Sequence, residues 1–149
     1  MALKKTKPSI PPIKRYCRGD RLPVQAQQIW MILTAFVMAR QLFDRSLEKT
    51  IEYGHLAELM GYRDARAGHM LSRQLGIVGR FCIENDLPPI NVIVVAKLTG
   101  KPGPEVLYRD DRTLKDEQRA VLQEDWFALR PPTTGTLRAV MERYALTKL

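Results

Sequence analysis

Cysteine and histidine are scarce in this chain, with two of each among 149 residues. Two cysteines, Cys17 and Cys82, cannot form the disulfide framework of a small secreted domain. A four-ligand zinc site would need both cysteines and both histidines, His55 and His69, and their spacing matches no zinc-binding pattern. We therefore expect no metal site, and a reducing, intracellular and cytoplasmic setting.

Long hydrophobic runs are also lacking. The two longest, 29–39 and 90–96, are short and contain Thr34 and Asn91. A transmembrane helix needs roughly 18 consecutive apolar residues, so we expect no membrane-spanning segment. The basic N-terminus has no apolar stretch of the kind found in a secretory signal, and we expect none.

Acidic residues are fewer than basic ones, 16 against 24, and the net charge is +8. The excess is concentrated: residues 1–25 hold seven basic residues against one acidic residue, and residues 62–80 and 129–149 each hold four against one. Such clustering is typical of proteins that bind polyanions, because each neutralised phosphate releases counterions. The alternative is an ordinary solvated surface.

Periodic apolar residues predict the helices. We expect a flexible basic arm over 1–21, a buried helix over 22–43, and a short helix over 54–60 with Leu56, Leu59 and Met60 facing inward. Gly61 suits a left-handed residue after that helix, and Asp64 suits the N-cap of the next one. Trp30 and Trp126 are interpreted as core anchors rather than as stacking platforms for bases.

A helix predicted over 65–84 carries both an apolar and a basic face. Leu71, Leu75, Val78 and Cys82 cluster on one side at helical spacing. Three arginines spaced seven residues apart form a stripe on the other side: Arg66, Arg73 and Arg80. Small residues, Ala65, Ser72 and Gly76, flank this stripe and would let the helix backbone approach a groove.

The order of elements predicts the fold class. A β-branched strand over 90–95, a glycine-rich turn over 99–103 and a return strand over 104–108 would form a hairpin. With the helices before it, this order is that of a winged helix-turn-helix. We expect an α+β, mainly helical protein, with a winged-helix domain over 22–103. A helical extension over 104–149, with helices over 112–125 and 137–146, packs on that domain.

Several segments share their order with one known family. These are QAQQIWMIL at 25–33, TIEYGHLAELMG at 50–61, ARA at 65–67, LPPI at 87–90 and Gly100. The chain resembles the DNA-binding domain of the O6-alkylguanine-DNA alkyltransferases and alkyltransferase-like proteins over 25–103. By that resemblance Tyr53 presses on the backbone of the target nucleotide and Arg66 fills the gap left by a flipped base. Without a one-residue gap after Gly61, Ala67 would take the place of Arg66. The resemblance also implies binding in the minor groove.

The catalytic stretch of that family, Pro-Cys-His-Arg, is missing. Residues 90–96 contain no cysteine, histidine or arginine. Alkyl transfer needs a thiolate with a neighbour that lowers its pKa. We therefore expect a protein that is not an enzyme and has no small-molecule cofactor.

The leading hypothesis is a non-enzymatic protein that binds double-stranded DNA. The expected contacts, including His69 beside the stripe and two lysines that bracket the wing turn, are Tyr53, Arg63, Arg66, His69, Met70, Arg73, Arg80, Lys97 and Lys101. Substitution of Arg66 or Arg73 by alanine is expected to weaken duplex binding. The alternative is a small adaptor subunit of a larger assembly, in which the winged helix docks a protein. RNA binding is a third hypothesis, but no aromatic-rich basic sheet supports it.

One acidic run needs a separate interpretation. Asp110, Asp111, Asp116 and Glu117 resemble the carboxylates of a metal-dependent nuclease. They stand in a single polar stretch beside basic residues, and carboxylates for a metal site normally converge from different elements. We interpret the run as the solvated start of a helix with ion pairs to the neighbouring basic residues.

Overall fold

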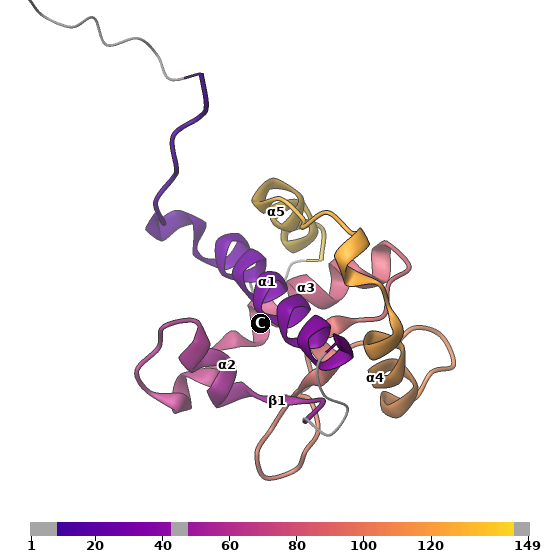
Figure 1. Cartoon of the computed structure of the whole chain (residues 1–149). Coiled ribbons are helices and arrows are strands. Elements are labelled where there is room, and N and C mark those ends of the chain that lie inside the picture. Colours follow the sequence, from indigo (N-terminus) through magenta and orange to yellow (C-terminus); the bar gives the residue numbers. More distant parts are fainter. Residues whose placement is uncertain (1–8, 43–47, 145–149) are drawn as a thin grey trace, which may run out of the picture.

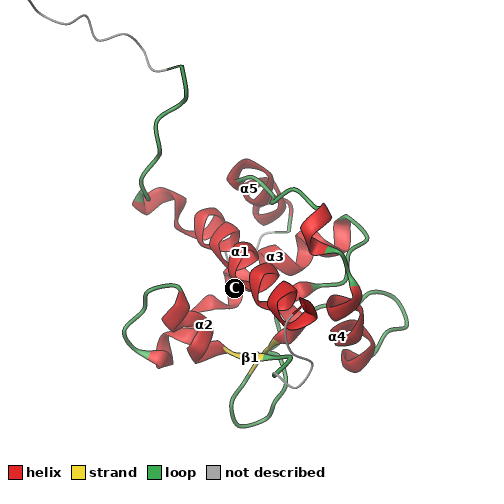
Figure 2. Ribbon diagram, in the orientation of Figure 1, coloured by secondary structure: helices red, strands yellow, loops and turns green. Residues whose placement is uncertain are grey.

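The computed structural model describes residues 9–42 and 48–144, and the fold is mainly helical (Figure 2). The α-helices are α1 (Arg21–Leu42), α2 (Tyr53–Leu59), α3 (Ser72–Glu84), α4 (Leu114–Gln123) and α5 (Thr134–Arg143). Short 3-10 helices are η1 (Arg18–Asp20), η2 (Ala65–Leu71), η3 (Ile90–Ile93) and η4 (Trp126–Ala128). Two strands, β1 (Ile51–Glu52) and β2 (Val94–Val95), pair in parallel.

Helix α1 is the centre of the core, and α3, α4 and α5 pack against it (Figure 1). Ile29 and Leu33 are fully buried, and Trp30 makes edge-to-face contacts with Phe81 and Trp126 at centroid distances of 5.4 and 5.5 Å. Both tryptophans are therefore core anchors, as expected. By length and composition α1 is apolar enough to cross a membrane, with a mean hydropathy of 1.3, which the sequence interpretation did not anticipate. That hydropathy is also what a central core helix requires.

The C-terminal helices share this core. Val121 of α4 and Leu137 of α5 are fully buried in the same cluster as the residues of α1 and α3. Helix α5 begins at Thr134, earlier than the predicted 137, because Thr133 caps it by accepting a hydrogen bond from the Thr136 amide at 3.1 Å. The arm predicted over 1–21 already has structure at its end. Asp20 of η1 pairs with Arg138 of α5 at 2.8 Å, and residues 1–8 lie outside the description.

The turn from α2 to η2 follows the sequence prediction closely. Gly61 has a φ of +93°, in the left-handed region, and Asp64 accepts a hydrogen bond from the Arg66 amide at 2.9 Å. Leu56 is buried, but Leu59, expected to face inward, is 53% exposed. Helix α2 ends at Leu59, so the last turn of the helix buries less apolar surface than the sequence pattern predicted.

The single helix predicted over 65–84 is wrong. Residues 65–71 form the 3-10 helix η2, and the α-helix α3 begins only at Ser72. A 3-10 helix turns by about 120° per residue, so a seven-residue spacing does not keep Arg66 in line with Arg73. Gly76 is buried rather than on the exposed side. The predicted apolar face is confirmed, since Leu71, Leu75, Val78 and Cys82 are all fully buried.

The C-terminal end of the arginine stripe is engaged within the protein. The guanidinium of Arg80 lies 4.4 Å from the ring centroid of Tyr144, which follows α5. Glu84 on the same helix pairs with Arg143 and accepts a hydrogen bond from the Tyr144 hydroxyl at 2.8 Å. The prediction of three outward-pointing arginines in one stripe is therefore wrong, because Arg66 is out of line with Arg73, and Arg73 and Arg80 are half-buried.

The strand predicted over 90–95 is mostly a 3-10 helix, η3, and only Val94 and Val95 pair with β1. All six residues are buried, and the Asn91 side chain donates to the Leu75 carbonyl at 3.0 Å. Among the described residues, 104–108 form no return strand. Residues 96–103 instead make a loop that projects from the body beyond β1 (Figure 1).

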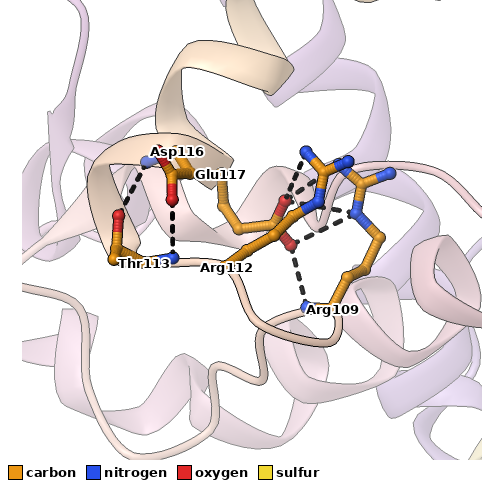
Figure 3. A network of polar contacts seen from close by, with 5 residues as sticks. All are labelled: Arg109, Arg112, Thr113, Asp116 and Glu117. Carbon is orange, nitrogen blue, oxygen red and sulfur yellow. Dashed lines mark hydrogen bonds and ion pairs between the residues drawn. The ribbon is translucent and has the colours of Figure 1, made fainter.

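One residue of the acidic run, Glu117 in α4, is the centre of a buried ion-pair cluster, whereas Asp110 and Asp111 are exposed (Figure 3). Glu117 is fully buried and accepts hydrogen bonds from the Arg109 amide at 3.0 Å and from its Nη2 at 2.8 Å. Arg112 lies 3.8 Å from the same carboxylate. Asp116 and Thr113 form a capping box at the start of α4. The predicted ion pairs are present, but the prediction that the run is solvated is wrong for Glu117.

Candidate nucleic-acid interface

Three segments far apart in the sequence surround one pocket of about 680 Å³, which we call the Tyr53 pocket. They are the first residue of α2, the helix η2 with the start of α3, and the loop after β2. The parallel pairing of β1 with β2 brings the first and third segments together, because Tyr53 follows β1 directly and the loop follows β2. The lining residues are Tyr53, Arg66, Gly68, His69, Ser72, Ala96, Lys97, Leu98, Thr99, Gly103, Pro104 and Glu105.

Gly68 sets the distance between η2 and α2. A Cβ at this position would lie 2.5 Å from the carbonyl carbon of Tyr53 and 2.8 Å from the amide nitrogen of Gly54. Contacts of that length with backbone cannot be relieved by a change of rotamer. The absence of a side chain at Gly68 is therefore what allows Arg66 and His69 to lie on the same pocket as Tyr53.

Tyr53 fastens the loop to the helices. Its hydroxyl donates to the Glu105 carboxylate and accepts a hydrogen bond from the Gly103 amide at 2.6 Å. Burial, followed by the hydrogen bond to Glu105, raises the pKa of the Tyr53 phenol above its ordinary value. The second oxygen of Glu105, Oε2, is buried without a hydrogen-bond partner. The pair therefore holds the loop while leaving one carboxylate oxygen unsatisfied.

Arg66 is the most outward of the predicted contacts in η2. Its side chain is 88% exposed, and its Nη2 pairs with Asp64 at 2.8 Å. The hydrogen bonds from Arg66 lower the pKa of the Asp64 carboxyl, which keeps this exposed pair charged. Ala67 instead packs against the core. Of the two residues that the family resemblance left open, Arg66 is thus the one that reaches solvent.

The other predicted contacts divide into three groups. His69 and Lys97 line the Tyr53 pocket, and Met70 is 54% exposed beside them on η2. Arg63 and Lys101 are exposed in the neighbouring turn and loop, outside the lining. Arg73 and Arg80 are half-buried on α3 and do not line the pocket.

Sequence reasoning missed Glu105, which is the residue that joins the loop to Tyr53. An isolated glutamate in an irregular segment carries no periodic signal, and its partner is 52 residues away in the chain. It also gave no role to Leu98, which is 97% exposed at the rim. No signal in the sequence marked Leu98, because a single apolar residue in a polar, glycine-rich turn is common at protein surfaces.

The described residues contain no cluster of histidine, cysteine and acidic side chains able to hold a metal ion. Cys82 is fully buried, and burial raises the pKa of its thiol to about 12. Cys17 is exposed in the segment before η1. Comparison of the chain with protein-family models, curated proteins and solved structures found no match. The site is therefore interpreted from its own geometry.

The Tyr53 phenol is expected to lose its proton at a higher pH than an ordinary tyrosine. Its pKa is raised in the folded protein, so the folded state keeps a proton that the unfolded chain releases above about pH 10. Stability from this hydrogen-bonded phenol is present below that pH and is lost as the pH rises further. When phenolate absorbance is followed against pH, the parent protein should show one step at high pH that the Tyr53→Phe variant lacks. An unchanged titration curve in that variant would contradict this assignment.

Proposed function

We propose that this chain is a non-enzymatic protein that binds double-stranded DNA through a helix-turn-helix of the alkyltransferase-like type. The elements α2 and η2–α3 would form the helix-turn-helix, and the loop 96–103 would take the place of the wing. One observation carries the proposal. Four of the residues that the sequence singled out as DNA contacts, Tyr53, Arg66, His69 and Lys97, come from three segments of the chain and line a single pocket.

The charges around the pocket support a polyanionic partner. Arg66 and Lys97 are exposed on two different elements that line the pocket, and Arg63 and Lys101 are exposed in the neighbouring turn and loop. The acidic groups at the site are already engaged, since Asp64 pairs with Arg66 and Glu105 accepts from Tyr53. Cations on separate elements can contact phosphates on both sides of a groove, which fixes the register of a protein on the duplex. Helix η2 exposes both Met70 and Arg66. This combination favours the minor groove, where apolar side chains and arginine are common contacts.

The state of the cysteines supports the absence of alkyl transfer. Cys82 is buried with a raised pKa, so its thiol cannot serve as an accessible nucleophile. The stretch where the resembling family carries its reactive cysteine corresponds to residues 93–96 here, and it contains no cysteine. A binding role needs none of that chemistry.

Arg66→Ala and Lys97→Ala should each weaken binding to a random duplex at low salt. Each should also reduce the slope of log affinity against log salt by about 1, because one phosphate contact is lost. A salt titration by fluorescence anisotropy measures both quantities. Arg119→Ala is the matched control, since Arg119 is exposed on α4, on the far side of α1 from α2 (Figure 1). Equal slopes in all variants and the parent protein would contradict the proposal.

One observation favours the adaptor alternative. A shallow apolar pocket between α1 and α2 is lined by Gln28, Met31, Ile32, Leu59 and Met60, and Met31 and Leu59 are more than half exposed. Flexible methionine side chains adapt well to a protein partner. A chain that shows no duplex binding at low salt, and that co-purifies with one stoichiometric protein, would favour this function instead.

A further inference from the structure

We infer that Leu98 is an apolar wedge that enters the base stack of the bound duplex from the groove. The inference rests on the proposed function and adds a contact that neither charge nor family resemblance supplies. Leu98 has the largest exposed fraction, 97%, of the large apolar side chains in the described part of the chain. Isolated exposure of this degree removes the side chain from any role in the core.

The loop presents Leu98 in a closed turn. The Gly100 amide donates to the Ala96 carbonyl at 2.8 Å, and the Ala96 amide donates to the Lys101 carbonyl at 2.9 Å. Gly100 has a φ of +67°, a conformation that glycine adopts without strain. The base of the loop is tied to α2 by the Tyr53 hydroxyl, which accepts from Gly103. Because the tip is already ordered, insertion of Leu98 would require little additional loss of conformational freedom.

The surroundings of Leu98 match the layout of a DNA groove. The exposed Lys97 and Lys101 flank it in the sequence of the loop, and Arg66 lines the same pocket as Lys97 and Leu98. A duplex offers two anionic backbones with an apolar base stack between them. An apolar side chain between cations is complementary to that pattern, and wedges of this kind partly unstack a base step and bend the duplex.

The test compares three variants on one duplex that carries a fluorescent adenine analogue, whose emission rises when it unstacks. Leu98→Ala should weaken binding about 10-fold, which is the loss expected when a leucine side chain is no longer buried on binding. It should also abolish the rise in emission while leaving the salt slope unchanged. Leu98→Met should restore both signals. Phe127→Ala, which removes another exposed apolar side chain, is the matched control.

The outcomes separate this inference from the proposed function. Absence of duplex binding by the parent protein overturns both. Duplex binding with a normal salt slope, but with identical affinity and emission for Leu98→Ala and Phe127→Ala, overturns the wedge and leaves the proposed function standing. Loss of binding to phosphatidylglycerol vesicles in Leu98→Ala, without any change on the duplex, would also overturn the wedge and would assign Leu98 to a lipid surface.

Discussion

Gly68→Ala is expected to lower the free energy of unfolding by about 3 kcal/mol, at the upper end of the cost of overpacking. The added methyl group would lie 2.5 Å from the carbonyl carbon of Tyr53 and 2.6 Å from its oxygen. Both atoms belong to the backbone at the start of α2, so η2 must move away from α2 as a unit. For a chain of this size, thermal unfolding should shift downward by about 10 °C.

The same variant should bind the duplex less tightly at temperatures where it remains folded. Arg66 and His69 travel with η2, and their displacement from Tyr53 opens the pocket. Gly135→Ala is the matched control, because a Cβ there meets only the Thr133 hydroxyl at 3.8 Å. Alanine within a helix is favoured over glycine by up to about 1 kcal/mol, so this control should be neutral or stabilising. Equal stability of Gly68→Ala and the parent protein would show that η2 does not pack on α2 as described.

Glu117→Gln is expected to be similarly damaging, for an electrostatic reason. The carboxylate is fully buried and receives the Arg109 amide, Nε and Nη2 (Figure 3). Removal of one charge from such a pair leaves the other without compensation and costs about 3 kcal/mol or more. Chemical denaturation followed by circular dichroism measures the change.

A double-mutant cycle measures the interaction free energy between Arg109 and Glu117 separately from their other contributions to stability. Arg109→Gln should cost less in the Glu117→Gln background than in the parent protein, because the cation then has no buried anion to lose. Glu142→Gln, at an exposed carboxylate on α5, should leave stability within about 0.5 kcal/mol of the parent. Additive effects of the two buried substitutions would contradict a direct coupling between them.

The sequence predicted well what depends on local pattern. The helical period of Ile29, Trp30 and Leu33 identified α1, and the apolar spacing of Leu71 to Cys82 identified the buried face of α3. Gly61 and Asp64 marked the turn before η2, since a left-handed residue and a cap have specific chemical requirements.

What the sequence could not predict depends on contacts between distant segments. The 3-10 conformation of η2 accompanies the close approach of Gly68 to Tyr53, which no local period encodes. The run 90–95 is buried on all sides, and a fully buried apolar run does not distinguish a strand from other conformations. Glu105 was missed because its partner, Tyr53, is 52 residues away in the chain. Glu117 was named, but its burial was not predicted, because the surrounding run is polar.

The parallel ladder joins Ile51 to Val94, and the hydroxyl of Tyr53 reaches Glu105 across 52 residues. Closing so long a stretch of chain is a slow step relative to helix formation, so the pocket is assembled late during folding. A polypeptide still emerging from the ribosome already carries every lysine and arginine of its N-terminal half, but not yet their arrangement. Under the proposed function, newly made chains are therefore expected to attract polyanions through charge alone, before the Tyr53 pocket has formed.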